Sequence, residues 1–162
     1  MRALPQRRGR ATVSGMTQPA VTTHQTSLSI ATKGRGLHDV TAEVRRVVAE
    51  SGVATGLCTC FLRHTSASLV IQENADPAVL RDLERWIERV APEDARAYEH
   101  DAEGLDDMPA HLRSSITRSS ESIPVTRGAL ALGTWQALYV WEHRVSAHTR
   151  ELIVHVMGMS SR

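Results

Sequence analysis

Strand-like alternation of apolar and polar side chains recurs along the chain from residue 22 onward. The first such segment, TTHQTSLSIAT at 22–32, is rich in threonine and alternates as a half-buried β-strand does. Further segments with strand character are 55–65, 66–74, 122–126, 130–144 and 151–158. Most of them follow one another without a long helix between, so the pattern predicts antiparallel pairing.

Helical spacing appears in three segments. Residues 38–52 carry valines on one face, and residues 109–116 predict a short helix that Pro109 opens. Residues 76–92 give the clearest pattern, because Asp76 can cap the helix at its first turn. Their apolar stripe consists of Leu80, Leu83, Trp86, Ile87 and Val90. Strands with two or three helices, the helices on one side of antiparallel sheets, predict the α+β class.

Composition narrows the class of protein. The 162 residues fit one domain, which we place at 22–159, and residues 1–21 predict a disordered basic tail. A net charge of +1 and 4% aromatic residues argue against nucleic acid or a membrane surface as a partner. Cys58 and Cys60 would share one face of a strand, where they fit buried core positions better than a disulfide or a metal site, so a reducing, cytoplasmic setting is expected.

Four of the eight histidines lie at strand ends or in the adjoining loops. These are His64, His100, His111 and His143, whereas His24, His148 and His155 fit structural positions better. The stretch HDAEGLDDMPAH, residues 100–111, places acids between two of the four. Imidazoles with carboxylates nearby suit a transition metal, although a solvated acidic loop is the other interpretation.

Three motifs in one order identify the chain as similar to a known family. FLRHTSASLVIQENAD, HDAEGLDDMPAHL and LGTWQALYVWEHR, together with KGRGLHDVT, resemble the YjbQ-like family of secondary thiamine-phosphate synthase enzymes. The resemblance covers residues 22–159; Ala137 stands where the family more often has glycine. It implies an α+β sandwich of two mostly antiparallel sheets with flanking helices, assembled as a homotrimer, and a divalent metal, zinc or else magnesium.

The resemblance implies the metal ligands, and the chemistry of the neighbouring side chains gives candidates for the other roles. Carried over to this chain, the resemblance makes His100, His111 and His143 the metal ligands. His64 is then the candidate acid or base, with Glu142 nearby, because its ordinary pKa lies near neutrality. Asp106 or Asp107 either orients a ligand histidine or favours the positive end of the helix that follows. Thr65, Ser66 and Arg144 are candidates to bind a substrate phosphate, or they end a strand and face solvent.

The implied reaction joins a pyrimidine diphosphate to a thiazole phosphate and releases pyrophosphate. Loss of diphosphate usually employs magnesium and oxygen ligands, whereas three histidines suit zinc, so another reaction on a phosphorylated small molecule stays open. A non-catalytic metal-binding trimer and a small-molecule binding module are the alternatives. Four protein ligands would indicate a structural site, and three with an open position a catalytic one. We expect the sparsely charged segment 130–141 to form the trimer interface, with Trp135 and Trp141 in the core or at that contact.

Overall fold

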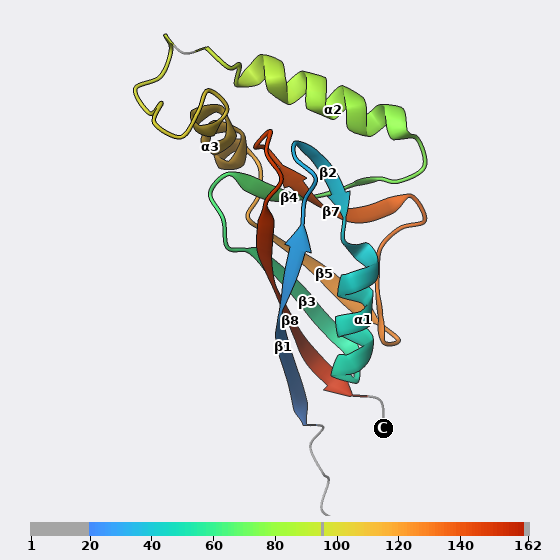
Figure 1. Cartoon of the computed structure of the whole chain (residues 1–162). Helices are drawn as coiled ribbons and strands as arrows, with labels where there is room; N and C mark the ends of the chain where they lie inside the picture. The colour runs from blue at the N-terminus through green and yellow to red at the C-terminus, as the bar shows by residue number, and fades with distance from the viewer. Residues whose placement is uncertain (1–19, 95, 161–162) are drawn as a thin grey trace, which may run out of the picture.

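The computed structural model describes residues 20–94 and 96–160 (Figure 1). Residues 1–19 of the tail expected at 1–21 lie outside the described residues. The first strand begins at Val21, the last residue of that expected tail. The elements in chain order are β1 (Val21–Ala31), β2 (Gly36–Asp39), α1 (Thr41–Ser51), β3 (Val53–Leu62), β4 (Ala67–Glu73), α2 (Pro77–Val90), α3 (Asp107–Ile116), β5 (Ser120–Thr126), β6 (Ala129–Leu130), β7 (Gln136–Glu142) and β8 (Thr149–Ser160).

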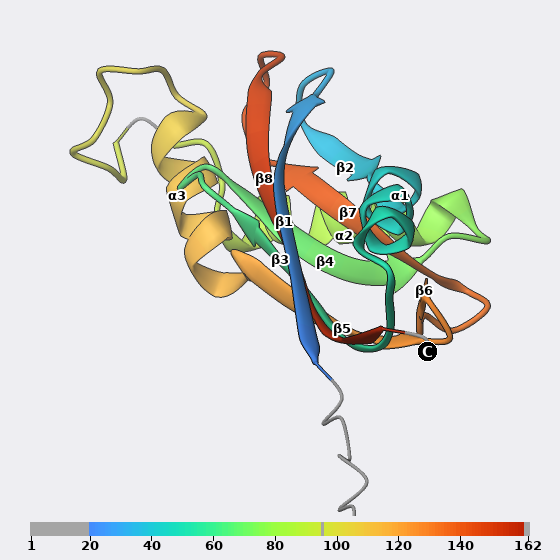
Figure 2. The same ribbon diagram turned by 90° about the horizontal axis from the view of Figure 1, so that it is seen from below.

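The strands form two sheets that share one core. The larger sheet has the order β1-β8-β3-β5-β6 and the smaller one β2-β7-β4, and every strand pairing within them is antiparallel. Valines of α1 are buried together with side chains of both sheets, because the helix presents Val44, Val47 and Val48 inward. The predicted α+β class is confirmed, and Figure 2 shows α1 lying against the curled strands.

The neighbouring strands β3 and β8 pair inside the larger sheet. Gly56 and Gly158 stand opposite each other, and a Cβ on either one would overlap the backbone of the other strand. The same strand carries Cys58 and Cys60, which are free and fully buried, as their spacing predicted. Small residues at this point let the larger sheet curl around the core.

The prediction of one long strand at 130–144 is wrong. The chain turns after β6, where the Gln136 N–H donates to the carbonyl of Gly133 at 3.0 Å, and a new strand, β7, starts in the smaller sheet. β7 pairs with β2 on one side and β4 on the other, so it is a central strand. Its lack of charge therefore reflects burial within this subunit, and it is not an exposed trimer edge. Trp141 is buried, while Trp135 in the turn is 65% exposed.

Two helices lie at the end of the molecule where β2, β4 and β7 meet (Figure 1). α2 begins as predicted, since the Asp76 carboxylate accepts from the Ala78 N–H at 2.8 Å. α3 starts at Asp107, two residues before Pro109, so Asp107 belongs to its first turn. No helix in the described part of the chain is both long and apolar enough to span a membrane.

Candidate metal centre and adjoining hollow

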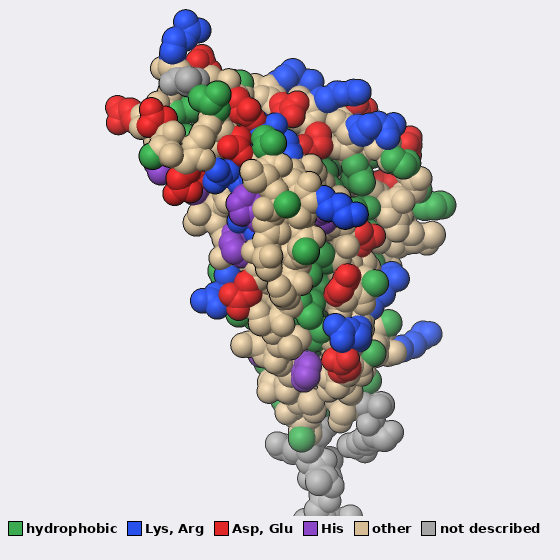
Figure 3. All heavy atoms as spheres, in the orientation of Figure 1, with side chains coloured by type: hydrophobic (Ala, Val, Ile, Leu, Met, Phe, Trp, Pro, Cys, Tyr) green, Lys and Arg blue, Asp and Glu red, His purple; other side chains and the backbone are tan. Residues whose placement is uncertain are grey.

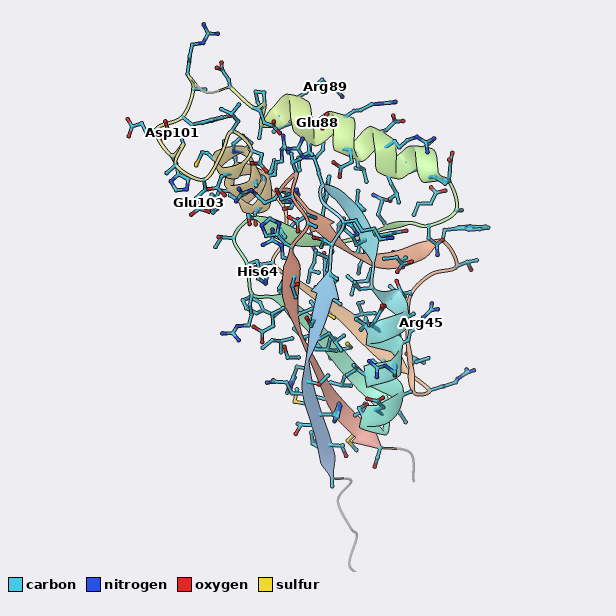
Figure 4. All side chains as sticks on the ribbon, in the orientation of Figure 1. Arg45, His64, Glu88, Arg89, Asp101 and Glu103 are labelled. Carbon is cyan, nitrogen blue, oxygen red and sulfur yellow. The ribbon has the colours of Figure 1, made fainter. Side chains whose placement is uncertain are left out.

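Three side chains meet at the start of α3. His100 comes from the preceding loop, and Asp107 and His111 lie one helical turn apart, so they face the same side. One ligand atom from each lies within 4.8 Å of the other two. Figure 4 shows where the loop runs, through Asp101 and Glu103, with His64 on the same side of the molecule. The structure thus brings together two of the three predicted ligands and adds a carboxylate.

Asp107 is the anion of this group, and its side chain is only 3% exposed. Its Oδ1 accepts from the Arg144 guanidinium. Its Oδ2 lies 2.8 Å from Nε2 of His100 and 3.6 Å from Nε2 of His111, yet no donor within residues 20–94 and 96–160 is aligned to hydrogen-bond it. A buried carboxylate oxygen without a donor is costly unless a cation compensates it. This donor set fits a divalent metal.

His111 is held in the orientation that a metal ligand needs. Its Nδ1 lies 3.0 Å from the carbonyl oxygen of Thr65, so Nδ1–H donates to that oxygen. The lone pair is then on Nε2, which faces Asp107. Fixing a ligand histidine through its second nitrogen is the usual arrangement in metal sites.

Arg144 holds the loop rather than facing a substrate. Its Nε donates to Asp106 at 3.0 Å, its Nη1 to Asp107, and its Nη2 to the carbonyl of Glu103 at 2.8 Å. Burial by itself raises the pKa of Asp106, but the Val145 N–H and Arg144 outweigh it and keep that pKa below its usual range. The forked guanidinium, predicted to bind phosphate, instead fixes the segment that carries His100 and Asp107.

Glu142 forms a buried ion pair that the sequence did not indicate. Arg150 donates to its two oxygens at 2.7 and 2.5 Å, Thr32 donates at 2.9 Å, and the Arg144 N–H donates at 3.0 Å. Burial alone would raise the pKa of Glu142, but these donors lower it. Arg150 and the buried Leu152 are two residues apart on β8 and therefore lie on the same face of the strand. A basic residue on the apolar face of a strand was the sequence feature that could have indicated a buried ion pair.

His64 lies against this ion pair. Its Nε2 accepts from the Glu151 N–H at 2.7 Å, and Arg150 approaches its Nδ1 at 3.4 Å. Burial, followed by the charge of Arg150, lowers the pKa of His64. The imidazole is therefore neutral at pH 7, with its lone pair on Nε2 and its proton on Nδ1.

A hollow of about 650 Å³ connects the two groups. Its wall contains both His64 and His111, so a molecule bound there touches the candidate metal centre and the candidate base. The predicted substrate residues Thr65 and Ser66 also line it. Ser66 accepts a hydrogen bond from Arg150 at 3.2 Å, which leaves its own O–H free to donate.

His143, the third predicted ligand, lies elsewhere. It is fully buried, and its Nε2 lies 2.9 Å from the Ser68 hydroxyl. Burial, with the charge of Arg113 next, lowers its pKa to about 3. In the group of potential ligands that the described residues form around Asp107, His143 has no place. Because β7 alternates, Glu142 and His143 point to opposite faces of the strand.

Fold and site define an α+β protein with a candidate metal centre at the edge of a hollow. The family model described as UPF0047 protein YjbQ-like matches residues 26–159. This chain therefore belongs to the YjbQ-like UPF0047 family. It is 58% identical over 135 residues to a UPF0047 protein of Synechocystis sp., covering 83% of this chain and 92% of the relative. It is 42% identical over 136 residues to YjbQ of Escherichia coli O157:H7, covering 83% and 98%.

Solved structures show the same fold. A YjbQ/UPF0047 family protein from Clostridium acetobutylicum superposes with a TM-score of 0.71 at 34% identity, covering 82% of this chain and 98% of that one. A YbjQ-like protein from Sulfolobus solfataricus superposes with a TM-score of 0.78 at 24% identity, covering 86% and 99%. The second likeness, at its lower identity, concerns the fold alone.

Proposed function

We propose that this protein is a metal-dependent enzyme that acts on a phosphorylated small molecule. The observation that carries the proposal is the buried Oδ2 of Asp107, which faces Nε2 of His100 and of His111 and has no hydrogen-bond donor among the residues that the structure describes. When bound, a divalent cation, zinc first, supplies a Lewis acid for a phosphoryl oxygen. The carboxylate in the donor set also suits magnesium better than three imidazoles would.

His64 is the proposed proton acceptor. It lines the hollow together with His111, and its lowered pKa keeps it neutral under ordinary conditions. The Glu142–Arg150 pair orients it from behind, so Glu142 acts through Arg150 and does not touch the substrate. A neutral imidazole at the wall of a substrate cavity can take a proton from an attacking group once its Nε2 lone pair leaves the Glu151 N–H.

The substrate is proposed to bind along the hydroxyls of the hollow. Ser66 offers its O–H to a phosphate oxygen, and Thr65 stands next to it on the exposed rim. Phe61, 45% exposed, gives the same hollow an apolar wall that fits a flat heteroaromatic ring. A phosphorylated pyrimidine and a thiazole phosphate, joined with release of pyrophosphate, have this combination of phosphate and ring.

The catalytic proposal is favoured over a purely structural metal by the number of ligands. Closed structural zinc sites have four protein ligands, whereas the described residues group three around this point. We also propose a homotrimer, but its interface is a different surface from the segment 130–141. Leu57 and Met157 expose 40% and 46% of their area on the strands β3 and β8, away from the buried β7.

The test is an activity screen of protein loaded with zinc or magnesium. Pyrimidine diphosphates with thiazole phosphates, and simple phosphate esters, are the substrates, and released pyrophosphate or phosphate is measured. We expect turnover by the wild type, and a loss of roughly 100-fold or more in kcat for His64→Ala with unchanged metal content.

His155→Ala is the matched control, because His155 lies on β8 away from the hollow and bonds to Gln25. It is expected to keep full activity. Absence of turnover in all metal-loaded samples, or full activity in His64→Ala, contradicts the proposed function.

A further inference from the structure

α2 carries two apolar lines, and the fold covers only one of them. Ile87 and Ala91 lie on the line that faces the body of the protein, and both are buried. The second line consists of Val79, Leu83, Trp86 and Val90. Its members are spaced by four, three and four residues, which places them along one side of a helix with 3.6 residues per turn.

The second line is open toward its C-terminal half. Trp86 is 45% exposed and Val90 is 50% exposed, while Val79 and Leu83 are half-buried. Trp86 and Val90 lie one helical turn apart, and apolar side chains at this spacing form the contact in paired helices. Large apolar side chains gathered in this way indicate an interaction surface.

The charges beside the line identify the kind of partner. On its solvent side the line is flanked by Asp82 and Arg89, which have opposite signs and lie seven residues apart. Figure 3 shows acidic and basic side chains interspersed over this end of the molecule. A mixed surface of this kind does not favour an anionic membrane, which attracts basic side chains of a single sign.

We propose that α2 pairs in antiparallel orientation with α2 of a second copy of this chain. The line is symmetric about its middle, so a twofold axis places Val79 opposite Val90 and Leu83 opposite Trp86 of the partner subunit. The same axis sets Asp82 of each copy against Arg89 of the other. A parallel pair would instead set the flank that carries Asp82 and Arg89 beside the flank of the partner helix that carries Leu80 and Ile87, so the two charges would not pair.

This contact is independent of the metal centre and of the proposed reaction. If the large sheet also forms a trimer, pairing through α2 joins two trimers. The mass of the wild type is in either case twice that of a variant in which the α2 contact is broken.

Sedimentation equilibrium of the full chain, from micromolar to millimolar concentration, tests the pairing. Arg89→Asp and Asp82→Arg each set like charges against each other, so each is expected to halve the mass. The double variant Asp82→Arg with Arg89→Asp exchanges the signs on both copies and is expected to restore it. Trp86→Lys is expected to halve the mass by placing a charge inside the apolar contact.

Arg81→Asp is the matched control, because it makes the same change of charge on the side of α2 away from the line. Its mass should equal that of the wild type. A wild type whose mass never exceeds that of Trp86→Lys, or a double variant that fails to recover, overturns the proposal. The second outcome would indicate a pair of these chains in another orientation.

Discussion

Two carboxylates of this protein are almost completely buried, and they differ in what surrounds them. Glu142 accepts hydrogen bonds at both oxygens, from Arg150, Thr32 and the Arg144 backbone. Among the described residues, Asp107 has a hydrogen-bond donor at Oδ1 only, while its Oδ2 faces two imidazole nitrogens. Both are acids near the same end of the molecule, 0% and 2% exposed.

The difference separates an acid whose charge is neutralised within the fold from an acid that is a candidate metal ligand. All the compensation that Glu142 needs comes from its own chain, so its charge is satisfied in the folded protein. The Arg144 guanidinium binds one oxygen of Asp107, and the other oxygen points toward two partly exposed histidines. Arg144 connects the two, because its backbone binds Glu142 and its side chain binds Asp107.

The largest expected effect on stability follows from breaking the satisfied pair. Glu142→Gln leaves Arg150 buried without a counter-charge, and we expect a loss of about 3–5 kcal/mol in the free energy of unfolding. Urea denaturation of the metal-free protein measures it. A loss below about 1 kcal/mol would show that the pair is no more important than a surface salt bridge.

Arg144→Met is expected to act on the metal and less on the fold. The guanidinium fixes Asp107 and the loop with His100 as a positioning residue, and loss of such an outer partner lowers metal affinity by about 10–100-fold. Competition with a chromophoric chelator gives the affinity. Arg63→Met, an exposed arginine at the hollow that pairs with Glu151, is the control and should leave the affinity unchanged.

The acid dependence of stability sharpens the same comparison. The folded pKa of Glu142 is lowered, so the stability it contributes is complete above its unfolded pKa of about 4.3 and is lost as the pH falls from there toward the folded value. Each such group changes the slope by at most about 1.4 kcal/mol per pH unit. The difference in stability between wild type and Glu142→Gln should thus shrink below pH about 4.3; a constant difference would contradict an ionised Glu142.

The smallest expected effect distinguishes the two candidate histidine ligands, His100 and His111. His111 is pre-oriented by the Thr65 carbonyl, whereas the His100 side chain is 51% exposed on a loop. A pre-oriented ligand loses less conformational entropy on binding, so His111→Ala should lower zinc affinity several-fold more than His100→Ala. Isothermal titration of both variants measures the ratio. Equal affinities would show that the Thr65 contact contributes nothing to binding.

Periodicity predicted most of the fold, but it failed where a chain reversal lies inside an apolar run. The segment 130–144 has strand character throughout, and only Gly133 marked the turn that sends β7 into the smaller sheet. The short strand β2 was missed because four residues carry too little alternation to be recognised. Neither burial nor sheet order is encoded locally, so an edge strand could not be distinguished from a central one.

The site was predicted in part, for a similar reason. His100 and His111 share a short segment with Asp107, and the spacing of Asp107 and His111 on a helix would have indicated a common face had the helix been started at Asp107. Arg150 was missed because it reaches His64 and Glu142 only through the pairing of distant strands. His143 was included because it lies at the end of an expected strand and because the family resemblance implied it as a ligand, whereas the structure buries it beside Ser68.

The central claim is that Asp107, with His100 and His111, holds the metal and that His143 does not. The most direct measurement is elemental analysis of untagged protein after incubation with zinc and desalting, for the wild type, Asp107→Asn and His143→Gln, with folding checked by circular dichroism. We predict one zinc per chain in the wild type and in His143→Gln, and almost none in Asp107→Asn. Loss of zinc from folded His143→Gln, together with retention in Asp107→Asn, would contradict the account.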